Sequence, residues 1–178
     1  EPEPANHALL LRNIEQNGYR NIETIRSVVS NRTGPSTLIL TALDNGRHSI
    51  YHHGLPEAGS VSVDTTTLDS FLETHGWPSI DLVKIDVEGA EKEVLEGMVQ
   101  LLRRSTELKL IVEFNPRLLR NAGVEPEQCL AALASWGLQI QIIDETAGQL
   151  SLETGGIMSL ASRLLATEGS VNLLCLQR

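Results

Sequence analysis

Acidic side chains gather at the end of a short apolar segment near the middle of the chain. Residues 80–91 read I-D-L-V-K-I-D-V-E-G-A-E, an apolar strand pattern that turns acidic just before a glycine. In an open parallel sheet, ligands bind outside the carboxyl ends of the strands. We therefore expect Asp86, Glu88 and Glu91 to lie at a functional edge of a sheet rather than in a core.

A further candidate carboxylate belongs to the next apolar strand. The run L-K-L-I-V-E-F at 108–114 predicts a buried strand with Glu113 near its carboxyl end. Neighbouring carboxylates raise one another's pKa through like-charge repulsion, which suits proton acceptance near neutral pH. Asp86 is therefore the first candidate for a catalytic base, and Glu88 and Glu113 are further candidates. Structural alternatives stay open, because Glu88 and Glu91 could simply favour a helix dipole and Glu113 could be a buried ion-pair partner.

Strand and helix patterns alternate along the chain, which predicts an α/β layered sheet that ends in two strands. Apolar periodicity predicts helices at 5–17, 66–72, 89–103 and 127–136, and strands at 22–30, 37–42, 49–52, 60–63, 80–86, 108–114, 138–143 and 171–176. The D-N-G triplet at 44–46 predicts a hairpin between the strands at 37–42 and 49–52. No linker interrupts the chain, so we expect a single domain over residues 1–178.

Composition argues against several classes of protein. The net charge of −9 disfavours nucleic-acid binding, which needs clustered Lys and Arg. No apolar run approaches the ~20 residues that cross a bilayer, so no membrane span is predicted. Cys129 and Cys175 lie in apolar patterns, which predicts free buried thiols in a reducing compartment and hence a cytoplasmic protein.

Three histidines, His48, His52 and His53, raise the question of a metal site. They lie in the predicted hairpin, with no cysteine or carboxylate at ligand spacing. The carboxylates near residue 86 could also bind a divalent metal, but their spacing in the sequence does not establish such a site. We therefore predict no metal.

Three runs together resemble the FkbM-type methyltransferases. They are V-S-V-D-T-T-T-L-D-S-F-L at 61–72, I-D-L-V-K-I-D-V-E-G-A-E-K-E-V-L-E-G-M at 80–98, and L-K-L-I-V-E-F at 108–114. The opening E-P-E-P-A-N-H-A-L-L-L-R-N is similar to the family's segment just after its second strand. The resemblance extends from Glu1 to about Pro116, and K-I-D-V-E-G-A-E is its most specific part.

This resemblance implies a class I, S-adenosylmethionine-dependent methyltransferase that acts on a hydroxyl oxygen of a small molecule, sugar or glycan. It implies a seven-stranded Rossmann-like sheet with helices on both faces and a C-terminal antiparallel strand pair. Glu1 would hold the cofactor's ribose hydroxyls, which a carboxylate can accept as hydrogen-bond donors. Asp86 would lie beside the methyl donor, and Ser30 and Asn31 would touch the adenine. The segment 35–60 would form part of the acceptor wall.

The sequence departs from the family at its start. The family's first strand and glycine-rich loop precede the E-P segment, whereas this chain begins at Glu1. We expect these elements to lie upstream in a longer protein, so that the sheet here is N-terminally truncated. One alternative is a non-catalytic, methyltransferase-like interaction module that has lost cofactor binding. Another Rossmann-like enzyme would need a G-x-G-x-x-G run, which the sequence lacks.

Overall fold

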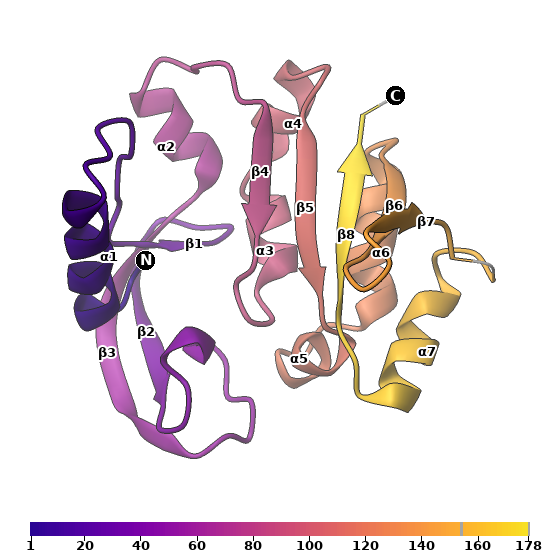
Figure 1. Cartoon of the computed structure of the whole chain (residues 1–178), viewed down its shortest axis with the longest axis horizontal. Helices are drawn as coiled ribbons and strands as arrows, with labels where there is room; N and C mark the ends of the chain where they lie inside the picture. Colours follow the sequence, from indigo (N-terminus) through magenta and orange to yellow (C-terminus); the bar gives the residue numbers. More distant parts are fainter. Residues whose placement is uncertain (154, 178) are drawn as a thin grey trace.

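Two β-sheets and the helices around them make up the fold (Figure 1). The computed structural model describes residues 1–153 and 155–177. Its helices are α1 (Pro4–Gln16), the 3₁₀ helix η1 (Asn45–Arg47), α2 (Leu68–Thr74), α3 (Glu91–Glu96), α4 (Val99–Arg104), α5 (Pro116–Asn121), α6 (Pro126–Ser135) and α7 (Ser159–Thr167). Its strands are β1 (Val28–Val29), β2 (Gly34–Thr41), β3 (Glu57–Thr66), β4 (Leu82–Ile85), β5 (Lys109–Phe114), β6 (Gln139–Asp144), β7 (Gln149–Ser151) and β8 (Val171–Leu176).

The larger sheet has the strand order β4-β5-β8-β6-β7. β4 and β5 are parallel, whereas β8 runs antiparallel to both of its neighbours, β5 and β6. β4, β5 and β6 therefore end at the same edge of the sheet. The predicted α/β class and the C-terminal antiparallel pair are confirmed, with β7 added as an antiparallel partner of β6.

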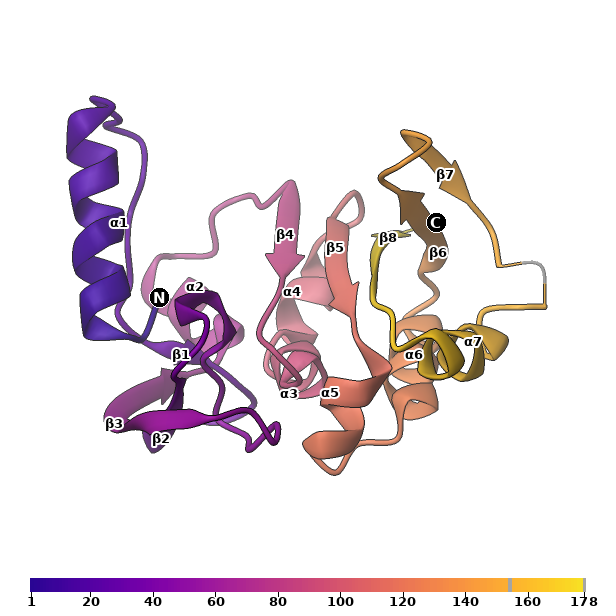
Figure 2. The ribbon, with the colours of Figure 1, turned by 60° about the horizontal axis from the view of Figure 1, so that its bottom comes forward.

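Helices pack against one face of this sheet, which corrects the expectation of helices on both faces. Leu110, Val112 and Phe114 alternate along β5 and are fully buried, while Ile111 between them stays partly exposed. Because successive strand residues point to opposite faces, only the face that carries the three buried residues is covered within the described part of the chain. Figure 2 shows α3, α5 and α6 on the same side of the sheet.

The smaller sheet has the order β1-β3-β2, and it overturns the predicted hairpin. β2 pairs with β3, so the strand predicted at 60–63 is the middle of a ten-residue strand. The segment at 49–52 makes only an isolated bridge, Ile39 to Ser49. The physical reason lies at Asp44, whose side chain accepts a hydrogen bond from the Gly46 N–H and thereby starts η1 instead of a two-residue turn.

The helix predicted over 89–103 is two helices, α3 and α4, that break at Gly97. Asp69, in the first turn of α2, accepts hydrogen bonds from the N–H groups of Gln100 (2.8 Å) and Leu101 (3.0 Å). A carboxylate from another helix thus caps the start of α4, which apolar periodicity alone does not reveal.

Some of the other predicted elements are confirmed, and others differ in the structure. The helices at 5–17 and 127–136 are confirmed, as is the short one capped by Thr67. The strand predicted at 22–30 shrinks to β1, while α5 and α7 were not predicted. Cys129 and Cys175 are both buried and free, as expected. Among the residues described, no helix has the length and apolar character needed to cross a membrane.

Candidate functional site

Three carboxylates meet at the carboxyl ends of β4 and β5. The two strands are parallel, and Ile85 pairs with Val112, so the next residues along each strand, Asp86 and Glu113, are neighbours. Glu88 joins them from the loop before α3, and one carboxylate oxygen of each residue lies within 4.8 Å of the others. The structure therefore brings together all three residues predicted to be catalytic. We call them the carboxylate cluster.

A tight turn aims Glu88 at this cluster. Glu88 has a φ of +51° and Gly89 a φ of +95°, so two successive residues occupy the left-handed region. The Glu88 carbonyl accepts hydrogen bonds from Ser49 Oγ at 2.8 Å and from His53 Nε2 at 2.7 Å. A Cβ on Gly89 would lie 2.9 Å from the Leu118 carbonyl oxygen, so this position requires glycine. The loop after η1 thus holds the turn in place.

Both basic and acidic groups surround the carboxylate cluster. Lys84 forms an ion pair with Asp86. Burial, followed by the charge of Glu113, raises the pKa of Glu88 to about 7, although Arg47 opposes this shift. The Arg47 Nε atom is 3.9 Å from Glu88 Oε2. Near neutral pH, the Glu88 carboxyl can therefore exchange a proton readily.

Glu113 is half-buried, and its pKa is also raised. Burial raises its pKa, and so do the charge of Asp86 and a hydrogen bond with it. Ser170 Oγ donates a hydrogen bond of 3.2 Å to Glu113 Oε1 and partly offsets the shift. Its position beside Asp86 makes Glu113 part of a carboxylate pair rather than the buried ion-pair partner that the sequence left open.

Glu91 lies outside the cluster and has a structural position. It is in the first turn of α3, is only 2% exposed, and its Oε1 accepts a hydrogen bond of 3.1 Å from the Gly89 N–H. Its other oxygen is buried without a hydrogen-bond partner. Burial raises the pKa of Glu91 to about 7. The helix-start alternative, rather than a catalytic one, fits this residue.

We expect Glu91 to make the stability of the protein fall as pH rises. Its usual pKa is 4.5 and its folded-state pKa is about 7, so the folded state binds the proton more tightly. The stabilising contribution is complete below pH 4.5 and is lost as pH rises through about 7. Urea unfolding from pH 4.5 to 8 should include a loss of about 3 kcal/mol from this group, which Glu91→Gln removes. The exposed Glu73→Gln control should retain the loss, and an unchanged slope in Glu91→Gln would contradict the prediction.

A cavity of about 300 Å³ opens on one side of the carboxylate cluster. Glu1, Asp86 and Glu88 contribute acidic groups to it, while Val28 and Leu38 contribute apolar surface. The segment expected to form an acceptor wall also lines this cavity, through Asn45, Gly46, His48, Ser49 and Ile50. Glu1 Oε1 accepts a hydrogen bond of 2.9 Å from the Glu3 N–H, which orients its carboxylate. Two of the residues predicted to bind a cofactor, Glu1 and Asp86, therefore share one cavity.

Ser30 and Asn31 lie at a neighbouring cavity of about 270 Å³. Ser30 is buried, and its N–H donates to the Thr66 carbonyl at 2.9 Å. Asn31 Nδ2 donates to Glu96 Oε2 at 2.8 Å. Ile50 lines both cavities, so the two spaces adjoin. The structure thus places these residues beside the Glu1–Asp86 cavity, not in it.

Each of the three histidines has a different hydrogen-bond partner. His48 Nδ1 accepts from the Thr41 N–H at 3.1 Å, and His52 Nδ1 lies 2.6 Å from Glu57 Oε1. His53 supports the Glu88 turn, and burial lowers its pKa. The carboxylate cluster, rather than the histidines, has the geometry that could hold a cation. The absence of a metal stays a prediction.

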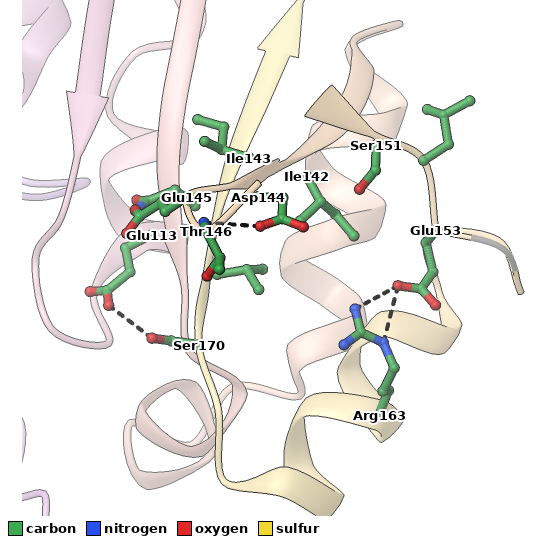
Figure 3. Close-up of a pocket in the computed structure, with 13 residues that line it drawn as sticks. Glu113, Ile142, Ile143, Asp144, Glu145, Thr146, Ser151, Glu153, Arg163 and Ser170 are labelled. Atoms are coloured by element: carbon green, nitrogen blue, oxygen red, sulfur yellow. Dashed lines mark hydrogen bonds and ion pairs between the residues drawn. The ribbon is translucent and has the colours of Figure 1, made fainter. Parts of the chain in front are cut away.

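A groove of about 780 Å³ opens on the other side of Glu113, as Figure 3 shows. It is lined by Glu113, Ile142, Ile143, Asp144, Glu145, Thr146, Ser151, Leu152, Glu153, Arg163, Ser170, Val171 and Asn172. Of these, only Glu113 was predicted from the sequence. Asp144 and Glu145 follow a strand that was predicted correctly, so the carboxyl-end rule that located Asp86 could also have located them.

The comparison with protein families identifies the chain's relatives. The profile of the methyltransferase FkbM domain matches residues 1–139. One similar protein is the hexuronic acid methyltransferase AglP of Haloferax volcanii, with 33% identity over 90 residues. The aligned part covers 51% of this chain but 34% of that relative's length. No solved structure matches.

Proposed function

The chain belongs to the methyltransferase FkbM domain family, and we propose that its residues 1–178 form one domain that transfers a methyl group from S-adenosylmethionine to a hydroxyl oxygen. The observation that carries this proposal is the carboxylate cluster. Asp86, Glu88 and Glu113 stand between the cavity that contains Glu1 and the groove beside Glu113. A cofactor and an acceptor could therefore approach the same carboxylates from two sides.

The strand order supports a Rossmann-like arrangement. β4, β5 and β6 are parallel to one another, and the antiparallel β8 is inserted between the last two. Ligands of such sheets bind outside the carboxyl ends of the strands, where the cluster lies. In the proposed fold, the family's first strand would lie beside the free edge of β4.

The Glu1–Asp86 cavity suits S-adenosylmethionine by its chemistry. A carboxylate at Glu1 can accept hydrogen bonds from two vicinal ribose hydroxyls, and Val28 and Leu38 offer apolar surface to a purine. Ser30 and Asn31, at the adjoining cavity, would extend the adenine side of the site. The bound cofactor would supply an electrophilic methyl group on a sulfonium.

Within this proposal, the chain's own residues orient the acceptor and accept its proton. Asp86 acts as the base, and Glu113, which has a carboxylate oxygen within 4.8 Å of one of Asp86, can share its proton. Lys84 forms an ion pair with Asp86 and orients its carboxylate. Glu88, whose pKa is raised to about 7 by burial and by the charge of Glu113, can take up or release a proton beside this pair. Orientation of the acceptor supplies the remaining advantage.

Titration calorimetry with S-adenosylhomocysteine tests the cofactor assignment. We expect binding with a Kd in the micromolar range, on the order of −8 kcal/mol. Glu1→Gln should weaken it about tenfold, because an amide accepts hydroxyl donors less strongly than a carboxylate. The control Glu15→Gln, on the exposed surface of α1, should bind as the wild type does. No binding to the wild type would count against catalysis by this chain, and no binding after the family's first strand and glycine-rich loop are added upstream would favour the interaction-module alternative.

A further inference from the structure

The groove beside Glu113 is large enough for a small-molecule ligand. Its volume of about 780 Å³ lies within the ~300–1,000 Å³ range of such sites. The ends of β5, β6 and β8 form its floor, and α7 contributes one wall (Figure 3). Glu113 belongs to both the groove and the carboxylate cluster. A ligand in the groove would therefore reach the proposed base.

Negatively charged side chains predominate in the lining of the groove. Glu113, Asp144, Glu145 and Glu153 line it, and among its described lining residues Arg163 is the only cation. Arg163 is already paired, because its Nε and Nη2 atoms donate to Glu153 Oε2 at 3.2 and 2.7 Å. Three carboxylates therefore face the groove without a partner cation from its lining. A negatively charged ligand would be repelled.

Hydrogen-bond acceptors outnumber donors along the same wall. Asn172 Nδ2 is used in a 2.6 Å hydrogen bond to Glu145 Oε1, while Asn172 Oδ1 is buried without a donor. Asp144 Oδ1 accepts from two N–H groups of the turn after β6, which fixes that carboxylate in position. A ligand with several O–H groups could donate hydrogen bonds to the exposed carboxylates of Asp144 and Glu145.

We propose that the acceptor is a hydroxyl-rich sugar ring without a carboxylate, and that the groove discriminates against hexuronates. This inference rests on the proposed methyltransferase function. The proposed acceptor differs from the hexuronic acid in the name of the similar protein AglP. The carboxylates without a cationic partner in the groove lining repel a uronate, whereas a neutral ring can donate hydrogen bonds to them through its hydroxyls. Glu145 is the specificity-determining residue, because it has no cationic partner in the groove lining and carries no proposed catalytic role.

Methyl glucoside and methyl glucuronide provide the test, because they differ only at the sixth carbon. We expect the whole chain, in saturation-transfer NMR titrations at low salt, to bind the glucoside about tenfold more tightly than the glucuronide. Glu145→Gln should narrow the difference to about threefold, since it removes one charge and keeps an acceptor for Asn172. Glu107→Gln, an exposed carboxylate beyond the opposite end of β5, should leave it unchanged.

Equal binding of the two sugars, tighter binding of the glucuronide, or binding of neither would each overturn the inference. An unchanged preference in Glu145→Gln would overturn the role of that residue. S-adenosylhomocysteine binding, measured on the same samples, keeps the two proposals apart. A sample that binds the cofactor product but prefers the glucuronide would contradict the groove inference alone, whereas sugar preference without cofactor binding would contradict the methyltransferase proposal alone.

Discussion

Replacement of Asp86 by asparagine should reduce the rate of methyl transfer by about 10²–10⁴-fold, the range for loss of a general base. Asparagine has nearly the same shape but cannot accept the hydroxyl proton. It also leaves Lys84 without its ion-pair partner and removes the charge that raises the pKa of Glu113. The rate, measured by transfer of labelled methyl groups to a neutral glycoside, should therefore fall much more than the affinity for S-adenosylhomocysteine.

Asp81→Asn is the matched control for this experiment. Asp81 lies just before β4, at the end of the strand opposite Asp86, and is exposed. The same change there should leave the rate within about twofold of the wild type. Full activity in Asp86→Asn would remove Asp86 from the mechanism. If Glu113→Gln alone then lost activity, the base would be Glu113.

The position of the carboxylate cluster could be predicted because it follows from local rules. Apolar runs identified β4 and β5, and parallel strands end at the same edge of a sheet. Asp86 and Glu113 had to be near one another once these two strands paired. The left-handed turn at Glu88 was beyond prediction, because its support comes from Ser49 and His53, more than thirty residues earlier in the chain.

Long-range contacts also explain the failed predictions of secondary structure. The D-N-G triplet is a strong local hairpin signal, yet β2 pairs with β3 along its whole length, and residues 49–52 reach the other edge of β2 only through the Ile39–Ser49 bridge. Similarly, the apolar stripe over 89–103 is helical in both halves, but the Asp69 carboxylate starts a new helix after Gly97. In this second case a distant residue supplied the deciding hydrogen bonds, whereas in the first the local Asp44 cap acts together with the β2–β3 pairing.

Gly97→Ala should destabilise the protein by about 3 kcal/mol and lower its Tm by roughly 10 °C. A Cβ at this position would lie 2.2 Å from the Ser30 carbonyl oxygen. This oxygen belongs to the backbone of a buried residue, so it cannot move aside as a flexible side chain could. To relieve this clash, either the break between α3 and α4 or the segment with Ser30 and Asn31 must move. Calorimetric melting measures the loss, and affinity for S-adenosylhomocysteine should fall in parallel.

Gly169→Ala separates this clash from the general effect of adding a methyl group. A Cβ there would meet only side chains, at 3.3 Å from Thr167 Oγ1 and 3.5 Å from Leu164 Cδ2, so the change should stay within about 1 kcal/mol. A wild-type Tm in Gly97→Ala would show that the Ser30 segment yields without cost. A low Tm with unchanged cofactor affinity would place the strain in α3 and α4 instead, and would argue against a role for Ser30 and Asn31 in binding. If Gly97→Ala lowers both the Tm and the affinity for S-adenosylhomocysteine, the helix break is linked to the proposed adenine side of the site.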